Sequence, residues 1–158
     1  MFYKENFHGI YLTINNYCII YLLIKINQNL PWYLGENKNL LYHSLVFDYK
    51  PVSTFYDLLE PIRKKIKKEI NQATFYMLRY GENNFKTIDN SDNKWGESNF
   101  TKLIYHINTS DGYTEISSQE KIPYTQNRSI IIDNQISTCE FSPVKSSLSL
   151  LLIMLFKK

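Results

Sequence analysis

The sequence predicts a two-layer α+β domain, in which a mixed four- to five-stranded sheet carries one helix packed on one face. Short runs rich in β-branched, aliphatic and aromatic residues are typical of strands. A single lysine-rich stretch has apolar residues at helical spacing. The chain has 158 residues and a formal net charge of +3. It is therefore long enough to bury one core, and its charge does not demand nucleic acid or an anionic membrane.

The predicted strands are short and are separated by turn residues. They are residues 19–26, 44–50, 74–81, 100–107 and 129–133. Pro51 ends the second run and Gly81 ends the third. Asp111 and Gly112 stand between two strand-like runs, a pattern that predicts a hairpin at this point.

The predicted helix follows Ser53 and Thr54, either of which can supply the N-cap oxygen. Its apolar stripe consists of Phe55, Leu58, Leu59, Ile62, Ile66 and Ile70. Pro61 interrupts this pattern. Either the helix kinks there, or residues 54–59 form a capping turn and Pro61 opens the helix.

One face of the predicted sheet is left open by a single helix. Alternation along the strands places Lys25 and Arg79 on the side away from the helix. Tyr21, Leu23, Phe75 and Met77 share that side. An apolar open face is covered either by the tail of the chain or by another protein. Tyr21, Leu23, Phe75, Met77 and Arg79 are therefore the predicted partner-binding residues.

Residues for catalysis or metal binding show no convincing pattern. His8, His43 and His106 are scattered, and the sequence has no Cys-x-x-Cys spacing for zinc. A nucleophilic triple of Cys139, His106 and Asp111 can be written down, but most chains of this size offer one. The prediction is a protein without catalytic residues, metal or cofactor.

Concentrated positive charge occurs in one place only. The basic run is Arg63, Lys64, Lys65, Lys67 and Lys68. Its residues flank Ile62 and Ile66, as the polar side of an amphipathic helix does. The run is interpreted as a solvated helix face, with an acidic partner or a phosphate backbone as the alternative.

The two cysteines do not make a disulfide framework, so the default expectation is an intracellular, reducing location. The apolar runs 18–26 and 148–156 are far shorter than the roughly 20 residues of a spanning helix. The expected organisation is an N-terminal extension (1–16), the main domain (17–108), a tail (109–145) and an apolar C-terminal end (146–158). Within the main domain, residues 27–43 are the expected insertion or loop.

The predicted order of strand, strand, helix, strand, turn, strand resembles the ubiquitin-like (β-grasp) superfamily, and elongin B most closely within it. The helix entry matches at Asp48, Lys50, Ser53, Thr54, Asp57 and Leu58. A later corner resembles the family at Asp92, Lys94, Gly96, Glu97, Phe100 and Thr101. The segments 21–25 and 137–143 are also similar. Pro61 and the insertion depart from the family pattern.

The resemblance implies a non-catalytic adaptor that pairs with an elongin C-like protein. Such a pair serves cullin-RING ubiquitin ligases and a transcription-elongation complex, which implies a nuclear and cytoplasmic location. The alternative from the residues themselves is a small basic-helix protein that associates with a membrane surface or nucleic acid. A small enzyme on an unrelated α+β fold is the third possibility.

Overall fold

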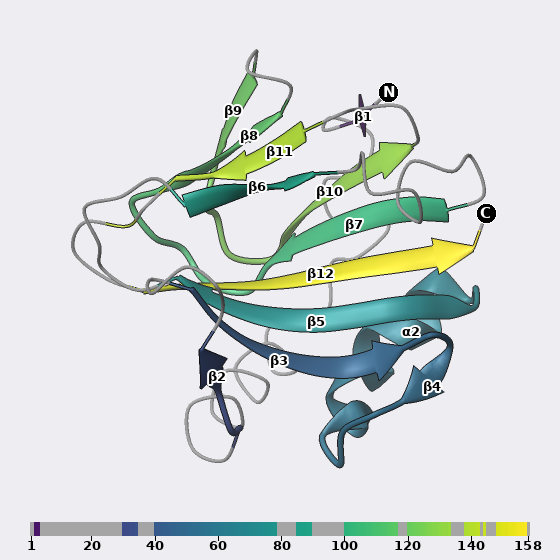
Figure 1. Cartoon of the computed structure of the whole chain (residues 1–158). Coiled ribbons are helices and arrows are strands. Elements are labelled where there is room, and N and C mark those ends of the chain that lie inside the picture. The colour runs from purple at the N-terminus through teal and green to yellow at the C-terminus, as the bar shows by residue number, and fades with distance from the viewer. Residues whose placement is uncertain are drawn as a thin grey trace.

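The protein is built from two antiparallel sheets that face each other (Figure 1). The structure is a computed structural model that describes residues 2–3, 30–34, 40–78, 85–89, 100–116, 120–133, 138–142, 144 and 148–157. The larger sheet has eight strands and the smaller sheet has four. Both form because strand-like sequence recurs along the described chain.

The larger sheet has the strand order β1-β10-β7-β12-β5-β3-β2, and β4 pairs with β3. Its strands are β1 (Phe2–Tyr3), β2 (Tyr33–Leu34), β3 (Leu40–Phe47), β4 (Lys50–Pro51), β5 (Ile70–Leu78), β7 (Phe100–His106), β10 (Arg128–Asp133) and β12 (Ser149–Lys157). The smaller sheet has the order β6-β11-β8-β9. Its strands are β6 (Phe85–Asp89), β8 (Tyr113–Ile116), β9 (Glu120–Pro123) and β11 (Thr138–Phe141).

From β5 onwards the chain distributes its strands between the sheets in a regular way. The strands β5, β7, β10 and β12 belong to the larger sheet, whereas β6, β8, β9 and β11 belong to the smaller one. The strand pairs that these eight strands form with one another are antiparallel. Two four-stranded layers connected in this way make a double-sheet jelly roll.

The C-terminal strand β12 is the centre of the larger sheet. It pairs with β5 on one side and with β7 on the other (Figure 1). Every residue from Ser149 to Phe156 is buried. A continuous apolar run is typical of a strand that is covered on both faces. The apolar C-terminal end of the sequence is therefore a core strand.

Two separate hydrophobic clusters lie on the two faces of the larger sheet. On one face, Leu59 and Ile62 from the helical segment pack with Phe75, Leu152 and Tyr105. The other cluster lies between the two sheets and joins the larger sheet to Phe141 of β11 and Ile122 of β9. We call the face that carries the first cluster the helix-side face, and the region that holds the second cluster the inter-sheet space.

The helical segment is short and has two parts. A 3-10 turn, Tyr56–Leu59, leads directly into the helix α2 (Glu60–Ile66), which has Pro61 in its first turn. The capping-turn interpretation of Pro61 is therefore confirmed. Lys67 ends the helix in the left-handed conformation, with a φ of 54°. Ile70, predicted to continue the helical stripe, instead begins β5.

The predicted β-grasp fold, with a mixed sheet and one packed helix, is wrong. The described chain forms two antiparallel sheets and a helix of seven residues. The predicted hairpin at Asp111 and Gly112 is also wrong, because the flanking strands β7 and β8 belong to different sheets. The predicted strands at 100–107 and 129–133 are confirmed as β7 and β10. The predicted strand 19–26 and the corner 92–97 lie outside the described residues.

Candidate binding site between the sheets

The residues predicted to form an open partner-binding face do not form one where the structure describes them. Phe75 has 0% exposure and packs in the helix-side cluster. Alternation along the strands predicts the other face of the sheet, away from the helix, for this residue. Met77 is partly buried against the same cluster. Tyr21, Leu23 and Arg79 lie outside the described residues. Phe75 is therefore covered by the chain's own helix and not by a partner.

The basic run borders a cleft on the surface of the protein. This cleft, of about 290 Å³, is lined by Val46, Tyr49, Tyr56, Arg63, Lys68, Glu69 and Ile70. The guanidinium of Arg63 pairs with Glu60 at 3.1 Å and lies 4.9 Å from the centre of the Tyr56 ring. Arg63 is thus engaged within its own helix, which supports the interpretation as a solvated face.

Hydrogen-bonding groups without partners lie in the inter-sheet space. The Nδ1 atom of His106 and the Oγ atom of Ser149 are both buried and have no hydrogen-bond partner. The backbone registers of β5, β7 and β12 place both residues on the same face as the inter-sheet cluster residues Leu78 and Leu151. Because such atoms usually find a partner, two of them on one face indicate a place for a polar ligand.

His106 is surrounded by residues that hold its ring in position. Its Nε2 atom lies 3.3 Å from Oγ1 of Thr114 on β8. The Tyr124 ring meets the imidazole edge-on, with 5.3 Å between the ring centres. Tyr124 in turn donates a hydrogen bond to the carbonyl oxygen of Ser142 at 3.1 Å. These contacts from β8 and from the residue after β9 fix the ring, so Nδ1 is the ring nitrogen left for a ligand.

The environment keeps His106 neutral and adds positive charge nearby. Burial, and next to it the charge of Arg128, lower the pKa of His106 from 6.5 to about 3. Arg128 on β10 is the direct cross-strand neighbour of His106 and is half-buried. Its guanidinium donates a long hydrogen bond of 3.4 Å to the carbonyl oxygen of Pro123. A guanidinium beside a neutral imidazole and a serine hydroxyl is suited to a carboxylate.

Close packing beneath the site depends on Gly112, which precedes β8. A methyl group at Gly112 would lie 2.7 Å from Oγ of Ser142 and closer still to the Tyr124 ring. Tyr124 therefore reaches His106 only because residue 112 has no side chain. The sequence alone marked Gly112 as a turn residue but not as a packing requirement.

The sequence marks His106 as a candidate only within a triple with Cys139 and Asp111, and it does not mark Ser149 or Arg128. Asp111 is exposed in the turn before β8. Cys139 lies on β11, and of this residue the structure describes the backbone only. The spacing of two residues between Ile104 and His106 on β7 places both on the same face, which is an available signal for an inward-facing histidine. No local signal connects Ser149 to His106, because their position on one face of the sheet depends on the order of the strands.

No family model matches the sequence, and no curated protein matches it. The structure, however, is similar to solved structures over nearly its full length. One is the viral collagen prolyl hydroxylase of Paramecium bursaria Chlorella virus 1 in its 2OG complex, where 2OG is 2-oxoglutarate. Its sequence identity is 12% and its TM-score 0.59, and the match covers 99% of this chain and 94% of that one.

Two further structures share the fold. The prolyl hydroxylase of Trichoplax adhaerens, solved with a hypoxia inducible factor peptide fragment, has 10% identity and a TM-score of 0.63 over 97% of this chain and 86% of that chain. An oxidoreductase of the 2OG-Fe(II) oxygenase family from Burkholderia pseudomallei has 9% identity and a TM-score of 0.66 over 94% and 81%. At these identities the likeness shows the fold, which is the double-stranded β-helix, or jelly roll, of these oxygenases.

These neighbours overturn the resemblance to the ubiquitin-like superfamily and elongin B. The three solved structures described above are two hydroxylases and an oxidoreductase. The predictions of a non-catalytic adaptor, of an elongin C-like partner and of a role in ubiquitin ligases are therefore wrong. The matched residues 48–58 belong instead to the turn after β3, to β4 and to the segment that leads into the 3-10 turn of a different fold. The likeness also lends no support to the alternative of a basic helix on a membrane or nucleic acid.

The described part of the chain contains no helix that is long and apolar enough to cross a membrane. The nuclear and cytoplasmic location stays a prediction.

The described residues do not fit the iron centre that the oxygenase fold implies. Non-haem iron oxygenases hold Fe(II) with two histidines and one carboxylate. Among the described residues, no group of three His, Cys, Asp or Glu side chains could hold a metal ion. His43 is on the helix-side face, where both ring nitrogens have partners within the protein. A two-histidine centre at His106 would therefore require His8, which lies outside the described residues.

Proposed function

We propose that this protein is a small-molecule enzyme of the double-stranded β-helix class, and that its substrate is an organic carboxylate bound in the inter-sheet space. The observation that carries the proposal is the pair of buried, unpartnered atoms, His106 Nδ1 and Ser149 Oγ, on the face that also carries Arg128. The oxygenase-fold neighbours support it, since the viral prolyl hydroxylase is a 2OG complex.

Each residue has a distinct role in holding the carboxylate. Arg128 supplies positive charge, and Ser149 donates a hydrogen bond from its hydroxyl. The neutral His106 ring supplies a second hydrogen-bonding group whose orientation Thr114 and Tyr124 fix. The apolar residues around them exclude water, which strengthens these interactions. No step is assigned to iron, because the described residues do not fit its ligand set.

Isothermal titration calorimetry with 2-oxoglutarate, succinate and acetate tests the binding, with and without added Fe(II). We expect saturable binding of at least one carboxylate without metal. Binding by Arg128→Gln should be at least about tenfold weaker, because a charge-assisted hydrogen bond contributes roughly 1.5–3 kcal/mol. Lys121→Gln is the matched control, since Lys121 is an exposed cation on β9 that stacks on Tyr113. Proton NMR of the bound carboxylate over time then detects its conversion.

Ser149→Ala separates a ligand site from a structural defect. Removing a buried hydroxyl that has no partner should raise the free energy of unfolding by about 1 kcal/mol, because an unsatisfied buried group is costly. The same substitution should weaken carboxylate binding. A variant that is more stable and binds equally well, or a wild-type protein that binds none of the three carboxylates, would overturn the proposed site.

A further inference from the structure

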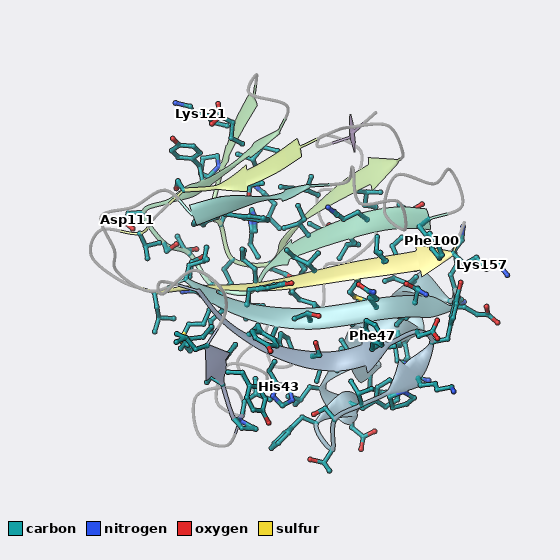
Figure 2. All side chains as sticks on the ribbon, in the orientation of Figure 1. His43, Phe47, Phe100, Asp111, Lys121 and Lys157 are labelled. Atoms are coloured by element: carbon teal, nitrogen blue, oxygen red, sulfur yellow. The ribbon has the colours of Figure 1, made fainter. Side chains whose placement is uncertain are left out.

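A second arrangement of reactive groups lies on the opposite face of the larger sheet, independent of the inter-sheet space. His43 on β3 is a direct neighbour of Phe75 and shares its helix-side face. Figure 2 labels His43 on the lower part of β3, near β2. Ser53 follows β4 and precedes the 3-10 turn. These two residues are joined by a hydrogen bond of 2.6 Å between His43 Nε2 and Ser53 Oγ.

The partners of the imidazole define which ring nitrogen carries the proton. His43 Nδ1 lies 2.7 Å from the carbonyl oxygen of Pro31, which can only accept a hydrogen bond. Nδ1 therefore carries a hydrogen, and when the ring holds only this one, Nε2 has a free lone pair. It follows that the hydroxyl of Ser53 donates to Nε2. A hydroxyl that donates to a histidine, which is oriented in turn by a third group, is the arrangement of an activated nucleophile.

The surroundings hold this arrangement in place. His43 is 4% exposed, with the Tyr33 ring stacked at 6.0 Å and the Phe55 ring edge-on at 5.7 Å between ring centres. The backbone N–H of Phe55 donates to Ser53 Oγ at 3.0 Å. This bond stabilises negative charge that develops on the oxygen. Ser53 itself is half-buried.

We propose that Ser53 and His43 form a nucleophile–base pair for acyl transfer from a small ester. Ser53 Oγ forms a bond to the carbonyl carbon while its proton passes to Nε2 of His43. The bond from that carbon to the leaving alkoxide then breaks, and the alkoxide takes the proton from Nε2. Water repeats the sequence on the acyl-serine, which releases the carboxylic acid and restores the hydroxyl. The carbonyl of Pro31 keeps Nδ1 protonated throughout.

The alternative role for the same contacts is structural. A serine hydroxyl that binds the N–H of the residue two positions later is a common turn motif. The histidine would then only attach this turn to β3. The two roles differ in the reactivity of Ser53, which a covalent probe measures directly.

The test uses the full chain and a fluorophosphonate probe. Attack of Ser53 Oγ on phosphorus breaks the phosphorus–fluorine bond, releases fluoride and leaves a stable adduct that mass spectrometry locates. We expect the adduct on Ser53, no adduct on Ser53→Ala, and labelling at least about 100-fold slower for His43→Gln, since general-base assistance contributes about 10²–10⁴-fold. Thr54→Ala, which removes the exposed neighbouring hydroxyl, should label at the wild-type rate.

Hydrolysis of p-nitrophenyl acetate by the same proteins should follow the same order, and near-ultraviolet circular dichroism establishes that each variant is folded. If a variant does not fold, the location of the adduct on the wild-type chain still decides. A wild-type chain without an adduct on Ser53, or equal labelling rates for wild type and His43→Gln, would overturn the pair and leave the turn as its only role.

Discussion

Individual residues of this protein have properties that their immediate surroundings impose. His106 is fully buried, and its burial and the charge of Arg128 lower its pKa from 6.5 to about 3. Between these two values the unfolded chain takes up a proton that the folded chain excludes. Stability should therefore be complete above pH 6.5 and should fall as the pH decreases towards 3.

The size of this effect can be measured by urea unfolding at several pH values. Within that window each pH unit removes about 1.4 kcal/mol, so the change from pH 7 to pH 4.5 should remove roughly 3 kcal/mol through this residue. Over the same pH range the His106→Leu variant should lose roughly 3 kcal/mol less of its free energy of unfolding than the wild type loses. Parallel pH profiles of the wild type and the variant would contradict the neutral state of His106.

Gly112 has a packing role that a single substitution can test. Its Cβ position overlaps the Tyr124 ring and Oγ of Ser142. Gly112→Ala should lower the free energy of unfolding by about 1–3 kcal/mol, the usual cost of overpacking a well-packed site. It should also weaken carboxylate binding, since Tyr124 orients His106. Thermal unfolding and calorimetry measure the two effects, and an unchanged melting temperature would refute the overlap.

At the scale of elements, the helical segment shows how a short element is stopped. Pro61 lies in the first turn, where a missing N–H costs nothing, and Lys67 closes the helix with a left-handed backbone. Its N–H donates to the carbonyl oxygen of Arg63 at 3.1 Å. Glycine is the residue that such a position favours. The sequence places lysine there instead, at some cost in stability.

Substitution by glycine should therefore have opposite effects at two lysines of this segment. Lys67→Gly should raise the free energy of unfolding by about 1 kcal/mol, because glycine adopts a positive φ without strain. Lys64→Gly, at an exposed position within α2, should lower it by about 1 kcal/mol. Chemical denaturation measures both, and a loss of stability in Lys67→Gly would show that the left-handed cap is wrong.

At the scale of the whole molecule, the inter-sheet space exists because strands from distant parts of the chain alternate between two layers. Ser149 begins β12, His106 ends β7 and Thr114 lies on β8. They share the inter-sheet space because β12 pairs with β7 and because β8 lies in the facing sheet. The site is therefore a product of the jelly-roll strand order, and no single element contains it.

Among the described residues, no group of side chains supplies the two histidines and one carboxylate of an iron centre. If the described residues alone decide metal binding, protein incubated anaerobically with Fe(II) and then desalted should retain far less than one iron per chain by elemental analysis. One iron per chain would show that residues outside the described ranges complete a centre. In that case His8→Ala and His106→Ala should each release the metal, because the third histidine of the sequence, His43, has partners at both ring nitrogens.

Part of the fold could be predicted from the sequence because strand formation depends on local residue pattern. The runs 100–107 and 129–133 are strands, and Pro61 with its preceding turn indicates where the helix begins. The apolar run at the C-terminus was interpreted as an end segment, although continuous apolar character is also typical of a central strand. Of the site, only His106 was considered, and as part of a triple that the structure does not support.

The sequence by itself determined which segments extend and where turns interrupt them, since alternation, β-branched residues, proline and glycine act over a few residues. Only the tertiary structure decided which strands pair, which sheet each belongs to and which side chains face each other. Those outcomes depend on contacts between residues far apart in the chain, such as Leu151 beside His106 and Phe75 beside His43. Strand pairing therefore placed Ser149 and His106 on one face of the larger sheet and Phe75 on the face that the helix covers. The local residue pattern could not decide this, because it does not specify which strands become neighbours.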